Sequence, residues 1–217
     1  MLLRHLYLYL NLEEYPKVLT TPFGFRTRYV CNFLERRFVP LRFCTDDYSK
    51  LLIQGTLRPD APAAQMPESA LVVPVEFDRA RYESLSGDEH HEFFISMLLV
   101  GFKKAAATHP IPRPELEGAV EEFRAGGYRN LWIAKEKTLR SARIKAKLSC
   151  TLDSEKFQLT LEVSRNSAIV YSKVILETKP DEIIFGYRFK NLVFEGNMIR
   201  VLDKFGKETF AVDSRTF

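Results

Sequence analysis

The segment Asp88-Glu89-His90-His91-Glu92 holds the densest set of side chains that could bind a metal ion or transfer a proton. Successive residues of a helix point about 100° apart, so five neighbours cannot all converge on one ion. A zinc-protease helix needs a second histidine four residues after the first, and that position after His91 holds Ile95. We therefore expect the charged first turn of a surface helix here, with no metal and no cofactor.

The cysteines give no sign of nucleophilic catalysis. Their odd number and wide spacing suit neither a disulfide framework nor a four-ligand zinc site, and they are Cys31, Cys44 and Cys150. Unpaired cysteines favour a reducing compartment, so we expect a cytoplasmic protein. The sequence has no Gly-x-Ser-x-Gly elbow and no phosphate-binding loop. A hydrolase-type site that assembles only in space, from the histidines of segment 88–92 beside a cysteine, stays open as an alternative.

Positive charge is concentrated in the C-terminal part of the chain. Residues 131–217 contain 16 Lys and Arg against 11 Asp and Glu, whereas residues 1–130 contain 16 against 17. A cluster within this part supplies our candidate partner-binding residues, which are Lys135, Lys137, Arg140, Arg143, Lys145 and Lys147. The simplest interpretation is a solvated sheet face. The functional interpretation is a docking surface, because charge of one sign on a rigid face steers association with an acidic partner.

These traits favour a non-enzymatic protein-binding module. Bacterial immunity proteins, which neutralise a cognate toxin by stoichiometric binding, are the representative class. The comparison rests on these general traits and on no shared motif. The net charge of +4 favours a partner with an acidic or mixed surface. Nucleic-acid binding through the basic face is the alternative, although Ile144 and Ala146 stand where stacking aromatic residues would be expected. No stretch reaches the roughly 18 apolar residues that a membrane helix needs.

The N-terminal half is predicted to mix strands and helices. Leucines alternate with polar and aromatic residues over 5–12, which is typical of a strand with one buried face. Apolar runs at 51–54 and 71–77 predict two more strands, with Pro74 arguing for an edge position. The spacing over 26–38 fits a helical face, but its aromatic and β-branched residues leave a strand open.

The rest of the chain is predicted to hold two helices and then strands. One helix is predicted from about Ser86–Asp88 to Ala107, and the other from Pro114 to Gly126-Gly127. Far upstream, the segment 20–22 with Pro22 predicts a break in secondary structure. Alternation with a period of two follows over three later runs, 143–148, 157–163 and 183–189. The expected fold is α+β: an N-terminal strand and mixed α/β portion, two central helices, and a C-terminal antiparallel meander packed on the helices. We expect one compact domain, 1–217, with a possible subdivision into 1–129 and 130–217.

Overall fold

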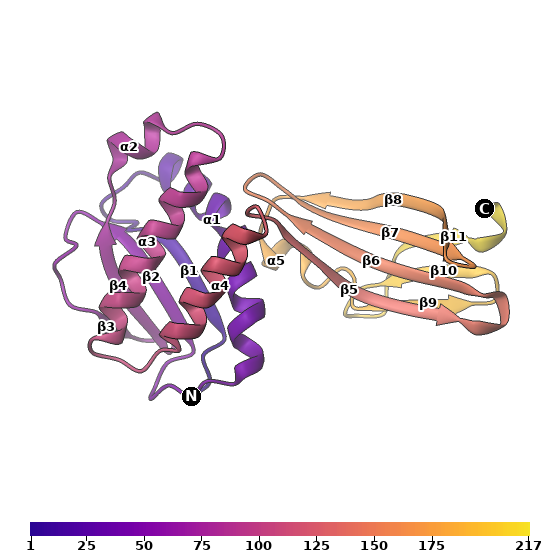
Figure 1. Ribbon diagram of the computed structural model, residues 1–217, viewed down its shortest axis with the longest axis horizontal. Helices are drawn as coiled ribbons and strands as arrows, with labels where there is room; N and C mark the ends of the chain where they lie inside the picture. The colour runs from indigo at the N-terminus through magenta and orange to yellow at the C-terminus, as the bar shows by residue number, and fades with distance from the viewer. The chain divides into compact units, whose positions relative to one another are not determined.

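A computed structural model describes residues 1–217, apart from the side chain of Ser141. The chain divides into two compact units, residues 1–130 and 131–217, and the possible subdivision of the sequence lay at the same place to within one residue. The first unit combines helices with a mostly parallel sheet, and the second is built from antiparallel strands (Figure 1). The predicted α+β class is confirmed.

The first unit contains a four-stranded sheet in the order β1-β2-β4-β3. Its strands are β1 (His5–Leu10), β2 (Lys50–Thr56), β3 (Ala64–Met66) and β4 (Ala70–Glu76). Strands β1, β2 and β4 are parallel, and β3 is antiparallel to β4. As predicted, the leucines of β1 at positions 6, 8 and 10 are buried. The predicted edge position of the strand with Pro74 is wrong, because β4 lies between β2 and β3. Pro74 lies two residues beyond Val72, the last residue of β4 that pairs with β3, so its missing N–H interrupts no bond to β3.

The described residues of the first unit also form four α-helices. They are α1 (Lys17–Phe38), the short α2 (Arg79–Ser84), α3 (Glu89–Ala106) and α4 (Arg113–Ala125). Helices α3 and α4 lie over the sheet (Figure 1), and Tyr29 and Phe33 of α1 contact the ring of Phe123 on α4. The predicted helices at 86–107 and 114–126 are thus confirmed, and Gly126 caps α4.

Helix α1 settles the open assignment of residues 26–38 as helix. The predicted break at 20–22 is wrong, because α1 continues through Pro22. Proline removes one helical bond, here the one to the carbonyl group of Val18, and Val18 is 81% exposed, so water can replace the missing donor.

Side chains of α1 close the free edge of β1. Thr27 Oγ1 donates a hydrogen bond to the carbonyl oxygen of Leu8 at 2.8 Å, and Arg28 Nη1 donates one to that of Leu6 at 2.8 Å. The N–H of Leu6 donates to Glu35 Oε1 at 2.7 Å. Arg28 and Glu35 also form an ion pair, with Nη2 and Oε2 3.2 Å apart. Three of the backbone groups that an edge strand leaves unpaired are therefore bonded to side chains of the same chain.

Helix α3 comes very close to β2 at Gly101. A Cβ atom added there would lie 2.6 Å from Cδ1 and 2.8 Å from Cγ2 of Ile53. We expect Gly101→Ala to lower the free energy of unfolding by about 1–3 kcal/mol, because the overlap outweighs the better helix propensity of alanine. Gly118 of α4 has no atom within 4 Å of such a Cβ, so Gly118→Ala should raise the free energy of unfolding by about 0.5–1 kcal/mol. Urea denaturation of both variants checks this, and stabilisation by both would contradict it.

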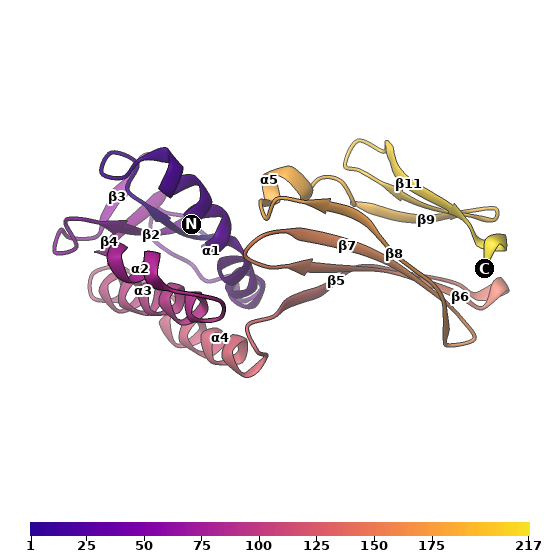
Figure 2. The same cartoon turned by 90° about the horizontal axis from the view of Figure 1, so that it is seen from above.

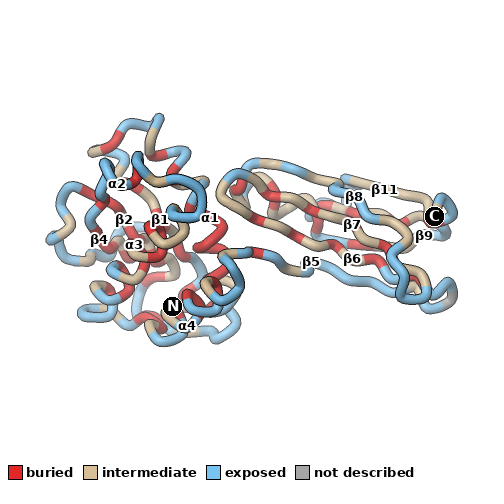
Figure 3. The backbone as a smooth tube through the Cα atoms, turned by 45° about the horizontal axis from the view of Figure 1, so that its top comes forward, coloured by how far each residue is buried: buried red, intermediate tan, exposed pale blue. Residues whose placement is uncertain are grey.

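The second unit contains two antiparallel sheets. One has the order β5-β6-β7-β8 and the other β11-β10-β9. The strands are β5 (Asn130–Leu139), β6 (Ile144–Leu152), β7 (Phe157–Arg165), β8 (Ala168–Thr178), β9 (Asn191–Glu195), β10 (Met198–Leu202) and β11 (Glu208–Asp213). The sheets lie as two layers (Figure 2), and buried positions alternate with less buried ones along β6 and β7 (Figure 3). The predicted meander is thus split into two sheets.

The predicted strand over 183–189 is wrong. Residues Glu182–Phe185 form a short helix, α5, whose cap Asp181 accepts a hydrogen bond from the N–H of Ile183 at 2.9 Å. Phe185 stacks on Phe157 with ring centroids 3.7 Å apart, and Phe189 stacks on Phe157 at 5.6 Å. The alternating aromatic residues therefore mark a helical turn and a following segment that pack against β7.

Candidate functional site

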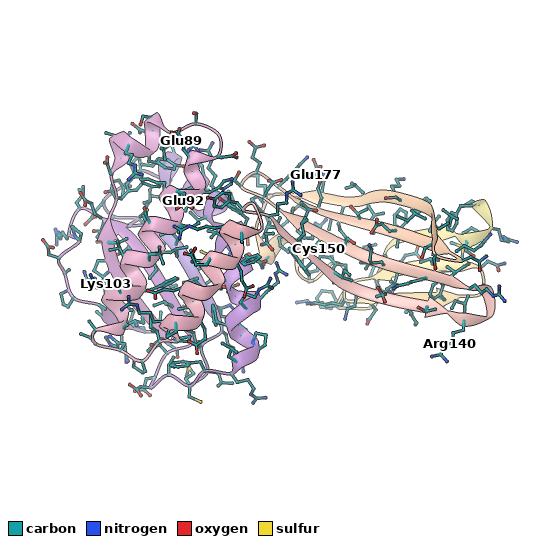
Figure 4. The ribbon with its side chains drawn as sticks, in the orientation of Figure 1. Glu89, Glu92, Lys103, Arg140, Cys150 and Glu177 are labelled. Atoms are coloured by element: carbon teal, nitrogen blue, oxygen red, sulfur yellow. The ribbon has the colours of Figure 1, made fainter. Side chains whose placement is uncertain are left out.

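All six basic residues of the predicted surface lie on one hairpin, formed by β5 and β6. Lys135 and Lys137 belong to β5, Lys145 and Lys147 belong to β6, and Arg140 and Arg143 lie in the connection between them. That connection is a 3-10 turn, Arg140–Ala142, and Arg143 follows it with a left-handed φ of 53°. Arg140 projects from the tip of the hairpin (Figure 4). The antiparallel pairing of β5 with β6 is what gathers these charges.

The two lysines of β6 are paired with carboxylates of the same sheet. Lys145 Nζ lies 2.8 Å from Glu136 Oε1, and Lys147 Nζ lies 2.5 Å from Glu162 Oε2. Lys147 and Glu162 stand directly opposite each other in the β6–β7 register. The hydrogen bond from Lys147 lowers the pKa of Glu162 below its ordinary value, and a second from Ser149 acts in the same direction. On this face, the positive charge of β6 is largely balanced.

The four other cations of the hairpin differ from Lys145 and Lys147 in having no carboxylate partner in the described part of the chain. Among the residues that the structure describes, none of the four forms an ion pair, and all are exposed; they are Lys135, Lys137, Arg140 and Arg143. The cations without an ion pair, which we call the uncommitted charges, therefore lie on β5 and at the tip of the hairpin. The ion-paired lysines lie on β6.

The segment 88–92 forms the first turn of α3, as predicted. Its second histidine, His91, packs into the first unit: Nδ1 bonds to the hydroxyl of Tyr29, the ring stacks on Tyr128 at 4.6 Å, and Nε2 lies 3.4 Å from Asp88 Oδ1. Burial lowers the pKa of His91 below its ordinary value, against the opposing effect of Asp88. His91 thus already has a partner on each side of its ring.

Glu92 has partners of its own. Its carboxylate accepts hydrogen bonds from Arg124 at 2.7 and 2.9 Å and from the hydroxyl of Tyr128 at 2.9 Å. The hydrogen bonds from Arg124 are the main reason that the pKa of Glu92 is lowered. Of the described residues, no three His, Cys, Asp or Glu side chains are grouped so that they could hold a metal ion. The polar groups of this turn therefore join α3 to α1 and α4.

Two of the three cysteines are buried. Cys31 is buried in α1, and Cys150 is buried in β6 (Figure 4), whereas Cys44 is exposed. A buried thiol in apolar surroundings is held in its uncharged, unreactive form.

A groove of 710 Å³ at the carboxyl ends of β1 and β2 is a feature that the sequence did not predict. Its floor includes Tyr9 and Gln54, which stand opposite each other in the β1–β2 register. The Gln54 amide donates to the Tyr9 hydroxyl at 3.1 Å, and the Thr56 hydroxyl donates to the Glu14 carboxylate at 2.6 Å. Most of its polar side chains thus bond to one another within the groove.

Within the described residues, none of the helices has the length and apolar character that crossing a bilayer requires. No protein-family model matches the chain, and no curated protein or solved structure gives a significant match.

Proposed function

We propose that the chain is a non-enzymatic protein-binding module that recognises an acidic or mixed-surface protein through the β5–β6 hairpin. The observation that carries the proposal is the set of four exposed cations without an ion pair on this hairpin, Lys135, Lys137, Arg140 and Arg143. Its biological form is immunity-type neutralisation, in which the chain binds a cognate toxin stoichiometrically in the bacterial cytoplasm.

The scaffold favours such recognition. Strand β6 is hydrogen-bonded on both sides, to β5 and to β7, so the hairpin is anchored in a sheet rather than carried on a loop. A backbone held in a sheet needs little reordering on binding, and charges of one sign raise the association rate with a negative partner. Lys145 and Lys147 are less available, because a partner would have to displace Glu136 and Glu162.

Reversing the four uncommitted charges should abolish capture of the partner. The wild-type chain, used as bait in a lysate of its native host, should retain one stoichiometric protein, which is then purified. The variant K135E/K137E/R140E/R143E should bind that protein at least about 100-fold more weakly, mainly through a slower association rate. Surface plasmon resonance at two salt concentrations measures both rates.

The matched control reverses four exposed cations elsewhere, in K17E/R42E/K103E/K190E, none of which has an ion pair in the described structure. It should bind within about threefold of wild type, since charges outside the contact act only through screened long-range effects. Equal loss in both variants would refute a role for the hairpin. Tight binding of a single-stranded oligonucleotide, with affinity falling steeply as salt rises, would favour the nucleic-acid alternative instead.

A further inference from the structure

The second unit contains an open pocket of 380 Å³ that the hairpin does not line. It lies between the two sheets, with residues of β7 and β8 on one side and of β11 and the segments beside it on the other. Its apolar wall is formed by Leu159, Ile175, Leu176 and Phe210. A cavity of this size is within the range of small-molecule sites, roughly 300–1,000 Å³.

Some of the charged side chains that line this cavity have partners within the protein, and others do not. Asp203 is buried and accepts hydrogen bonds from the backbone N–H groups of Phe205 at 2.7 Å and Lys207 at 2.9 Å. Glu208 forms an ion pair with Arg200. Both carboxylates of the lining are therefore already stabilised by donors of the protein.

The two cations of the lining have no such partner. Within the described residues, neither Arg188 nor the side chain of Lys207 forms an ion pair. The Arg188 guanidinium lies over the ring of Tyr187, 5.7 Å from its centroid, which holds it without neutralising it. The cavity thus combines an apolar wall with two positive charges that have no carboxylate of their own.

We propose that this cavity binds a small amphipathic carboxylate, a medium-chain fatty acid. The alkyl chain contacts Leu159, Ile175, Leu176 and Phe210, and the carboxylate lies between Arg188 and Lys207. Apolar burial supplies affinity, and the paired cations supply selectivity for a negative head group. This site is independent of the proposed hairpin contact, because none of the hairpin cations lines it.

Titration of the full chain with decanoate, below its micelle-forming concentration, tests the proposal by isothermal calorimetry. We expect saturable binding of one decanoate per chain and no saturable binding of decyltrimethylammonium, which has the same chain and the opposite charge. The variant R188Q/K207Q should raise the Kd for decanoate by about tenfold or more. The control K103Q/K190Q, which removes two exposed cations outside the cavity, should leave it within about twofold.

A second variant keeps the test decisive if R188Q/K207Q does not fold. Ile175→Phe places a larger side chain in the wall and leaves both cations in place, so it should also weaken decanoate binding about tenfold. Failure of decanoate to saturate, equal binding of both detergents, or unchanged affinity in the folded variants would overturn the proposal. None of these results bears on capture of a protein by the hairpin, so the two proposals fail separately.

Discussion

Replacing Arg28 by alanine is expected to lower the free energy of unfolding by about 3–5 kcal/mol. The substitution leaves the Glu35 carboxylate, whose side chain is 13% exposed, without the guanidinium 3.2 Å away. It also removes the donor to the Leu6 carbonyl oxygen at the edge of β1. A buried charge and a buried carbonyl group that lose their partners are both destabilising. Urea denaturation followed by far-ultraviolet circular dichroism measures the change.

Arg37→Ala is the matched control on the same helix. Arg37 also pairs with a glutamate, Glu122, at 2.7 Å, but its side chain is 42% exposed, so its loss should change the free energy of unfolding by about 0–1 kcal/mol. The double variant R28M/E35L should regain part of the stability lost in R28A, because the carboxylate is removed together with its cation, although the N–H of Leu6 then loses its acceptor. Similar losses in R28A and R37A would show that the edge of β1 does not depend on this ion pair.

Phe157→Ala should destabilise the second unit by about 3–5 kcal/mol. Phe157 is fully buried, and its ring lies nearly parallel to those of Phe185 and Phe189, at centroid distances of 3.7 and 5.6 Å. Alanine would leave a cavity and remove the surface on which α5 packs. The chain has one tryptophan, Trp132, whose ring lies 6.0 Å from that of Phe157, so its fluorescence reports unfolding at this place.

Phe205→Ala serves as the control for Phe157. Phe205 belongs to the same unit and is 77% exposed, so its removal should change the free energy of unfolding by no more than about 0.5 kcal/mol. A small effect of Phe157→Ala, close to that of Phe205→Ala, would mean that the three stacked rings do not hold α5 against β7.

The sequence predicted those elements whose periodicity directly reflects burial. The alternating leucines of β1 and the run Ile144, Ala146 and Leu148 of β6 are all buried on one side, as a period of two requires. Helix α3 was predictable because its first turn is acidic, its last turn is basic and a proline-rich segment follows it. In these segments local preference and tertiary burial agree.

Other elements depend on contacts that no local pattern contains. Helix α1 has aromatic and β-branched residues that also suit a strand, and its packing against β1 and α4 decides between the two. In the 183–189 run, the helical turn capped by Asp181 prevails over the period of two. The alternation therefore predicted a strand where the chain forms a short helix.

The candidate surface was also predictable only in part. Its six basic residues could be identified from composition and spacing alone. Which of them keep an uncommitted charge depends on strand register, because register places Glu162 opposite Lys147. The cavity with Arg188 and Lys207 could not be predicted either, since it exists only where two sheets face each other.

The side chains that saturate β1 restrict how the first unit can join other polypeptides. Many complexes form when an extended segment extends a sheet by one more strand, using backbone groups left open at its border. Here one border is occupied by Thr27, Arg28 and Glu35. The other is the three-residue strand β3, which lies between Pro62 and Pro67 and offers little length for pairing. Both borders of this sheet therefore offer few free backbone groups to an additional strand.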